Sequence, residues 1–115
     1  MKKEMIIKYR NKKIKIIVKE CNLFGKFKGL MFSSREKAKN LLFNFNIKQK
    51  IRIHSFYVLF PFIAIWLDDK NNVVDLKRVR PFELIVSPKA PAYKLIEIPI
   101  NKKNKNLVKL FSARR

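Results

Sequence analysis

Hydrophobic and polar residues alternate along much of the chain, and a period of two is typical of strands with one buried face. Ile14, Ile16 and Val18 fall on one side of such a strand, and three lysines fall on the other. A second short strand is predicted over residues 5–10. Because Asn11 separates the two segments and asparagine favours tight turns, we expect a hairpin there.

The alternation breaks between residues 22 and 32, which are predicted to form an irregular or briefly helical connection. Ser33 and Glu36 then have the spacing of a capping box, in which the two side chains bind free amides at the start of a helix. We therefore expect a short helix over residues 34–40.

Alternation resumes over residues 41–45 and continues through residues 48–54, with Ile51 and Ile53 on one face. The other face carries a basic stripe made of Lys48, Lys50, Arg52 and His54. The sequence thus predicts a strand with one cationic side.

Residues 56–67 lack alternation and are rich in aromatic and β-branched side chains, which indicates strands buried on both faces. Pro61 lies in the middle, so we expect two strands that are bent or interrupted there. Residues 68–72 are rich in Asp and Asn and are predicted to turn into a further strand over residues 73–79, completing a hairpin.

The C-terminal third begins with an extended loop that contains Pro81, Pro88 and Pro91. A clear strand is predicted over residues 93–99, and the basic segment 101–115 contains a candidate last strand at residues 107–111. About eight short strands and little helix predict one all-β domain over residues 1–115. Its expected form is a small β-sandwich or jelly-roll-like barrel with one or two short helices.

The chain has 115 residues, enough for one hydrophobic core, and its 48% hydrophobic residues are typical of a folded domain. Its 28 Lys and Arg against 8 Asp and Glu give a formal charge of +20, which favours polyanionic partners. Lys, Asn, Ile and Phe are abundant, as an AT-rich genome would also produce. Composition therefore leaves a functional and a purely compositional origin of the charge open.

The N-terminal apolar stretch, the longest uncharged run and the number of cysteines indicate the compartment of the protein and whether it spans a membrane. The apolar stretch after the basic N-terminus is too short for a signal peptide. The longest uncharged run is about half of the roughly 20 residues that span a bilayer. Cys21 is the single cysteine, which excludes an internal disulfide and favours a reducing compartment. We expect a cytoplasmic protein without a membrane span, and the sequence does not determine its oligomeric state.

Three blocks of sequence carry a resemblance to a known family. The blocks are 29–32 (Gly-Leu-Met-Phe), 53–61 with 65–68, and Arg80-Pro81 with 93–99. In order and spacing they resemble the domain of unknown function 192 family, in its archaeal form, over roughly residues 14–100. The resemblance implies a small β-sandwich or jelly-roll-like barrel and no established activity. Ile63 stands where the family commonly has an acidic residue, and Ile100-Asn101 where it commonly has glycine.

Candidate chemistry is sparse. His54 is the single histidine, and no clustered metal ligands, paired carboxylates or Gly-rich phosphate loop accompany it. No catalytic residue, metal site or cofactor is therefore predicted, and an enzyme is the lowest-ranked function. Glu97 shares a strand face with Leu95, where a carboxylate needs a cation or backbone amides unless it belongs to a pocket. One hypothesis is a small-ligand or carbohydrate-type pocket near His54, Trp66 and Glu97.

The leading hypothesis is a non-enzymatic module that binds nucleic acid or another polyanion without base specificity. The residues predicted to bind it are Lys48, Lys50, Arg52, Lys77, Arg78, Arg80, Arg114 and Arg115. Exposed aromatic side chains beside the stripe would add stacking on single strands. The sequence leaves open whether Tyr9, Tyr57 or Phe82 is exposed.

Overall fold

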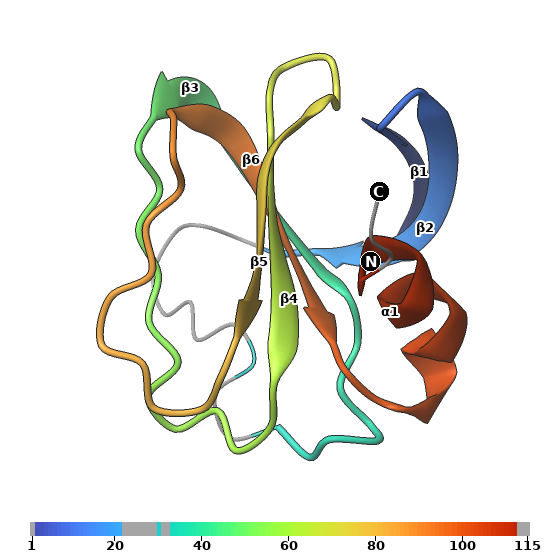
Figure 1. Cartoon of the computed structure of the whole chain (residues 1–115), viewed down its shortest axis with the longest axis vertical. Helices are drawn as coiled ribbons and strands as arrows, with labels where there is room; N and C mark the ends of the chain where they lie inside the picture. Colours follow the sequence, from blue (N-terminus) through green and yellow to red (C-terminus); the bar gives the residue numbers. More distant parts are fainter. Residues whose placement is uncertain (1, 22–29, 31–32, 113–115) are drawn as a thin grey trace.

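A computed structural model describes residues 2–21, 30 and 33–112, and it shows one curled sheet of six strands in the order β1-β2-β3-β6-β4-β5 (Figure 1). The elements are β1 (Lys2–Tyr9), β2 (Lys12–Glu20), β3 (Leu41–Gln49), β4 (Phe62–Leu67), β5 (Val73–Val79), β6 (Ala92–Pro99), the 3-10 turn η1 (Lys102–Asn104) and α1 (Lys105–Ser112). Strands β2 and β3 pair in parallel and the other pairs are antiparallel. The curled sheet forms a half-barrel, which confirms the predicted all-β class.

Strands β1 and β2 form the predicted hairpin, with Tyr9 opposite Lys12 at its tip. Arg10 and Asn11 make the turn with φ angles of 51° and 64°, the left-handed conformation that tight two-residue hairpins require. The alternate positions that begin at Ile14 are buried, as their spacing predicted.

The sheet curls far enough for its two edges to touch. The Lys8 N–H donates to the carbonyl oxygen of Asn71 at 2.9 Å, which joins β1 to the turn between β4 and β5. This turn is the one predicted at residues 68–72, and Asp68 Oδ1 accepts hydrogen bonds there from the backbone N–H groups of Lys70 and Asn72. Contact between the edges leaves less unpaired strand backbone exposed.

Strand β4 is buried on both faces, so hydrophobic clusters lie on opposite sides of the sheet. Alternate β4 residues enter the two clusters: Phe62, Ala64 and Trp66 on one side, and Ile63, Ile65 and Leu67 on the other. This confirms the second half of the strand pair predicted at residues 56–67. The first half is wrong, because residues 56–60 form a loop in which Val58 and Phe60 alone are buried.

The C-terminal strand predicted at residues 107–111 is also wrong, because these residues belong to α1. Leu107, Val108, Leu110 and Phe111 have the three-to-four-residue spacing of a helix face, and they pack against the cluster inside the curl. Figure 1 shows α1 beside the β1–β2 hairpin, and the Phe111 ring lies 5.6 Å from that of Tyr9. The helix therefore closes one opening of the half-barrel.

The helix predicted at residues 34–40 is a turn. Ala38 N–H donates to Ser34 O at 2.9 Å, the one helix-like hydrogen bond that the structure gives this segment. Glu36 does not close a capping box, since its carboxylate accepts the Lys102 N–H at 3.0 Å. The strand predicted over residues 48–54 ends early, with β3 at Gln49. Most of the predicted connection at residues 22–32 lies outside the described residues.

Candidate functional site

Ser55 ties together the two loops that follow β3 and β5. Its side chain is fully buried; the Oγ donates to Arg80 O at 2.6 Å and accepts the Glu83 N–H at 2.6 Å. Its backbone N–H donates to Glu83 O at 2.9 Å, and its carbonyl accepts the N–H groups of Phe82 and Val58. With so many hydrogen bonds converging on one buried residue, the loops at residues 54–60 and 80–86 form a single unit.

Apolar side chains gather on this unit and remain exposed. We define the aromatic loop patch as Phe56, Tyr57, Leu59, Phe82, Leu84 and Ile85, whose exposed fractions run from 42% to 70%. Tyr57 and Phe82 each have a φ of 63°, which is costly for a residue with a large side chain. The Ser55 carbonyl accepts the Phe82 N–H and so helps to hold Phe82 in this conformation, in which its ring is exposed to solvent.

Basic residues of the predicted stripe border the aromatic loop patch. Arg52 and His54 are exposed at the start of one loop, and Arg80 is exposed at the start of the other. The two segments are adjacent because Ile53 and Val86 exchange backbone hydrogen bonds of 3.0 and 2.7 Å. The structure thus brings Arg52 of the predicted basic stripe close to Arg80 of the predicted group at residues 77–80.

The remaining predicted polyanion-binding residues lie in several places. Lys48 and Lys50 are exposed at the end of β3 and just beyond it. Lys77 is half-buried, and its ammonium donates to Ser87 O, so it fastens a loop to β5. Arg78 is exposed on β5, opposite Ile63 of β4. Arg114 and Arg115 lie outside the described residues.

In the part of the chain that the structure describes, none of the three hollows lined by described residues includes His54, Trp66 or Glu97. His54 is exposed, and its Nδ1 accepts the Phe56 N–H at 3.2 Å. Trp66 is fully buried in the core, where its indole N–H donates to Ile51 O at 2.8 Å. The indole is therefore a satisfied core group.

Glu97 lies on β6 between Leu41 of β3 and Ala64 of β4, with 5% of its surface exposed. Burial raises its pKa to about 8, so the carboxyl is largely protonated at neutral pH. Within the described ranges no hydrogen bond or ion pair of its side chain is found. The neutral form is favoured because a carboxylate would lose its hydration among apolar neighbours.

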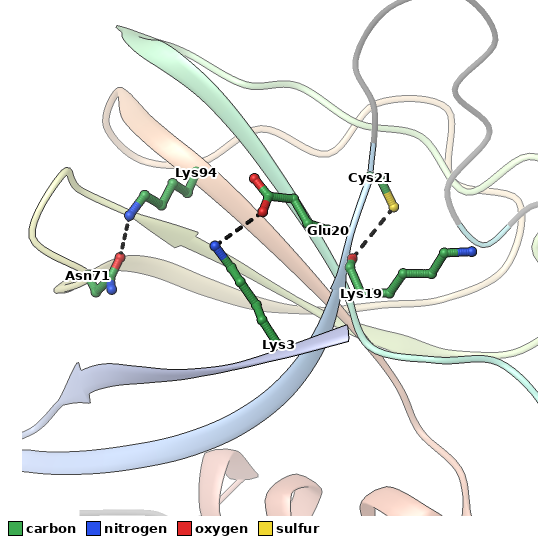
Figure 2. Close-up of polar contacts among 6 residues, drawn as sticks. All are labelled: Lys3, Lys19, Glu20, Cys21, Asn71 and Lys94. Carbon is green, nitrogen blue, oxygen red and sulfur yellow. Dashed lines mark hydrogen bonds and ion pairs between the residues drawn. The ribbon is translucent and has the colours of Figure 1, made fainter. Parts of the chain in front are cut away.

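Cys21 packs on the same cluster as the neighbours of Glu97, just beyond the end of β2. Figure 2 shows its thiol directed at the carbonyl oxygen of Lys19, with a distance of 3.7 Å. Burial is the largest influence on this thiol and raises its pKa above the ordinary value. A thiol that stays protonated is a poor nucleophile. The same view shows the Lys3–Glu20 ion pair, whose N···O distance is 3.2 Å, and the Lys94–Asn71 hydrogen bond.

Among the residues that the structure describes, no group of three or more His, Cys, Asp or Glu side chains is arranged to hold a metal ion. No described helix has the length and apolar character needed to cross a bilayer.

Sequence reasoning did not identify most of the aromatic loop patch. The continuous apolar run that contains Phe56 and Leu59 predicts burial for both. Leu84 and Ile85 lie among prolines in a region without periodicity, where burial cannot be deduced from spacing. The one available signal was the aromatic identity of Tyr57 and Phe82 near basic residues, and both are exposed.

The chain is similar to proteins of known sequence and structure. The profile of the DUF192 family, described as "Uncharacterized ACR", matches residues 6–110. A UPF0127 protein of the archaeon Thermococcus sibiricus is 36% identical over 78 residues, which are 67% of this chain and 50% of that protein. The match therefore spans half of that relative's length.

Solved structures share the fold. A protein of Sinorhizobium meliloti described as a candidate transcription regulator superposes with a TM-score of 0.72 at 14% identity, covering 93% of this chain and 85% of that chain. A protein of unknown function from Novosphingobium aromaticivorans gives a TM-score of 0.70 at 14% identity, covering 93% of this chain and 79% of that chain. At such low identity the likeness shows the fold alone. With the profile match over nearly its whole length, the chain belongs to the DUF192 family, as its three sequence blocks predicted.

Proposed function

We propose that the protein is a non-enzymatic module that binds single-stranded nucleic acid through the aromatic loop patch. The observation that supports this is the exposure of Phe56, Tyr57 and Phe82 on two loops that Ser55 fastens together. Exposed rings can stack on bases, and each stacked base contributes about 1–3 kcal/mol. Since every base has a flat face, such binding tolerates many sequences.

Charge beside the patch provides the second part of the proposed interaction. Arg52 and Arg80 border the aromatic side chains from the two loops, and Lys48 and Lys50 continue the basic stripe toward β3. Each phosphate that a cationic side chain neutralises releases a bound counterion, so affinity would fall steeply as salt increases. The formal charge of +20 would also speed association with a polyanion.

A purely compositional origin of the charge predicts a different result. In that case nucleic acid would bind weakly over the whole basic surface, and no single side chain would matter more than another. The proposal instead makes affinity depend on the aromatic rings, whose removal changes no charge. Aromatic variants therefore separate the two explanations.

The experiment is a titration of a fluorescently labelled single-stranded 20-mer with the protein, followed by anisotropy at roughly 50 and 200 mM salt. The double variant Phe56→Ala/Phe82→Ala should bind at least about tenfold more weakly, which corresponds to the loss of one stacked base. The matched control is Ile6→Ala/Ile47→Ala, which removes exposed apolar side chains from the sheet. Equal weakening in both variants, or no binding of the unmodified protein at 50 mM salt, would overturn the proposal.

The charge contribution is tested separately. Arg52→Gln/Arg80→Gln should reduce the slope of log affinity against log salt by about 1–2, because one or two phosphate contacts are lost. Lys12→Gln/Lys13→Gln removes the same charge from the exposed tip of the β1–β2 hairpin and should leave the slope nearly unchanged. Equal slopes for the two variants would show that the arginines beside the patch have no special part in binding.

A further inference from the structure

A second surface feature lies far from the two loops in sequence, along the part of β2 that extends beyond its short pairing with β3. It is a hollow of about 380 Å³, which we call the lysine hollow. Its lining comes from the start of β1, from β2, from the segment before β3 and from η1 and α1. The lining residues with charged or amide side chains are Lys2, Lys15, Lys19, Lys39, Lys103, Asn40 and Asn104.

The charge of the lysine hollow is of one sign. Five lysine residues line it, and no Asp or Glu occurs among its described lining residues. Glu20, the acidic residue next to Lys19 in sequence, is engaged by Lys3 in an ion pair of 3.2 Å. Concentrated positive charge around a concave surface attracts anions and is partly relieved when one binds.

The backbone of β2 adds a donor on the same side. The Asn40 side-chain amide donates to Ile17 O at 3.1 Å, and the Lys19 N–H donates to Asn40 O at 2.8 Å. The Ile17 carbonyl is therefore directed away from β1. In an extended strand the N–H and C=O of one residue point the same way, so the Ile17 N–H is also directed toward the lysine hollow. Backbone N–H groups are common phosphate ligands in proteins.

The wall of the hollow is fixed by hydrogen bonds between elements far apart in sequence. Asn104 is buried, and its side-chain amide donates to Asn40 Oδ1 at 2.9 Å and to Pro99 O at 2.8 Å. Asn40 in turn binds Ile17, so η1, the segment before β3 and β2 are linked in series. A binding surface that is ordered before its ligand arrives loses less entropy on association.

An accessible apolar side chain also lines the hollow. Ile17 is 60% exposed, whereas the half-buried Leu107 of α1 packs against the cluster on the opposite face of β2. We propose that the lysine hollow binds a small phosphate monoester, with the phosphate held by the lysines and the Ile17 N–H and an aliphatic group lying on the exposed Ile17 side chain. The ligand class follows from the combination of five cations with a short apolar surface.

The test is a titration of the full chain with n-hexyl phosphate and, separately, with inorganic phosphate, followed by amide chemical shifts in nuclear magnetic resonance. Hexyl phosphate should shift the Ile17 and Asn40 signals and bind at least about tenfold more tightly than inorganic phosphate, because its chain buries apolar surface. Ile17→Thr keeps the backbone N–H but loses the aliphatic surface, so it should remove most of that difference.

A matched pair of triple variants tests the charge. Lys19→Gln/Lys39→Gln/Lys103→Gln should weaken hexyl phosphate binding at least about tenfold, whereas Lys12→Gln/Lys13→Gln/Lys37→Gln removes three exposed lysines outside the lining and should weaken it less than about twofold. Equal weakening by both triples, equal affinity for the two phosphates, or no saturable shift at the hollow would overturn the inference. The Phe56→Ala/Phe82→Ala variant should retain this binding, so the result is independent of the proposed nucleic-acid site.

Discussion

The hydroxyl of Ser55 donates to the backbone oxygen of Arg80 at 2.6 Å, although the two residues lie 25 positions apart in the chain. The hydroxyl oxygen of Ser55 also accepts the Glu83 N–H, so one small side chain satisfies two backbone groups of the opposite loop. Serine fits here because its hydroxyl both donates and accepts within a small volume. This connection determines which loop residues face solvent.

Ser55→Ala should lower the free energy of unfolding by about 2–3 kcal/mol, because it leaves the Arg80 carbonyl and the Glu83 N–H without their partner in a buried position. Urea denaturation followed by tryptophan fluorescence measures the change. Ser34→Ala, at an exposed position, should change stability by less than about 0.5 kcal/mol. A loss for Ser55→Ala as small as that of the control would contradict the role assigned to this hydroxyl.

Phe82→Asn should stabilise the protein or leave it unchanged while weakening oligonucleotide binding. Phe82 has a φ of 63° and is 58% exposed, and asparagine adopts this backbone conformation at lower cost. The expected gain is up to about 1 kcal/mol in thermal unfolding. Ile47→Asn, on β3 with an exposed side chain, relieves no such strain and should not raise the thermal midpoint. A Phe82→Asn protein that binds as tightly as the original would remove Phe82 from the proposed site.

Glu97 should make stability depend on pH. Its pKa is raised by burial to about 8 in the folded protein, whereas the unfolded chain titrates at the ordinary value near 4.5. Between these values the folded state binds more protons, so stability should fall as pH rises from about 5 to 8 and then level off. Glu97→Gln should abolish this slope and stabilise the protein at pH 7 by on the order of 3 kcal/mol.

The measurement for Glu97 is a series of urea denaturation curves between pH 5 and pH 9. Glu83→Gln provides the control, since Glu83 is only half-buried and its carboxylate accepts the Arg80 N–H. The free energy of unfolding of this variant should therefore fall with pH as steeply as that of the unmodified protein. An unmodified protein with flat stability across this range would show that Glu97 is ionised in the folded state.

Phe111→Ala should cost about 3 kcal/mol, because the ring is 4% exposed and fills the opening of the half-barrel next to Tyr9. Lys109→Ala, on the exposed side of α1, should be nearly neutral. Chemical denaturation of both variants measures the difference. Similar stabilities for the two variants would mean that α1 does not contribute to the core.

Local sequence chemistry was sufficient for most of the observed strands and for two hairpin turns. Alternation placed Ile14, Ile16 and Val18 on a buried face, because a strand exposes every second side chain to the same side. Asn11 and the Asp68–Asn72 segment marked the hairpin turns, because Asp and Asn bind nearby backbone groups and tolerate left-handed angles. These features depend only on residues that are close together in the chain, so they can be recognised in a single sequence.

The wrong predictions concern segments whose local sequence is compatible with more than one structure, so that long-range packing determines which one forms. Residues 107–111 are compatible with a short strand, but the open end of the half-barrel accepts a helix with one apolar side. Glu36 could have capped a helix, but the Lys102 N–H competes for its carboxylate. The hydrogen-bond partner of Glu36 lies 66 positions away in the chain, and the opening that accepts the helix is formed by other strands. Neither can be recognised from the local sequence.

The sequence by itself determined a small, basic, all-β domain of the DUF192 family with its main strands and hairpins, because periodicity, turn chemistry and charge are local or additive properties. Tertiary structure alone decided that Phe56, Tyr57 and Phe82 are exposed, and that five lysines separated in the chain surround one hollow. The physical reason is that exposure in aperiodic loops, and the meeting of side chains from distant segments, depend on hydrogen bonds such as those of Ser55 and Asn104.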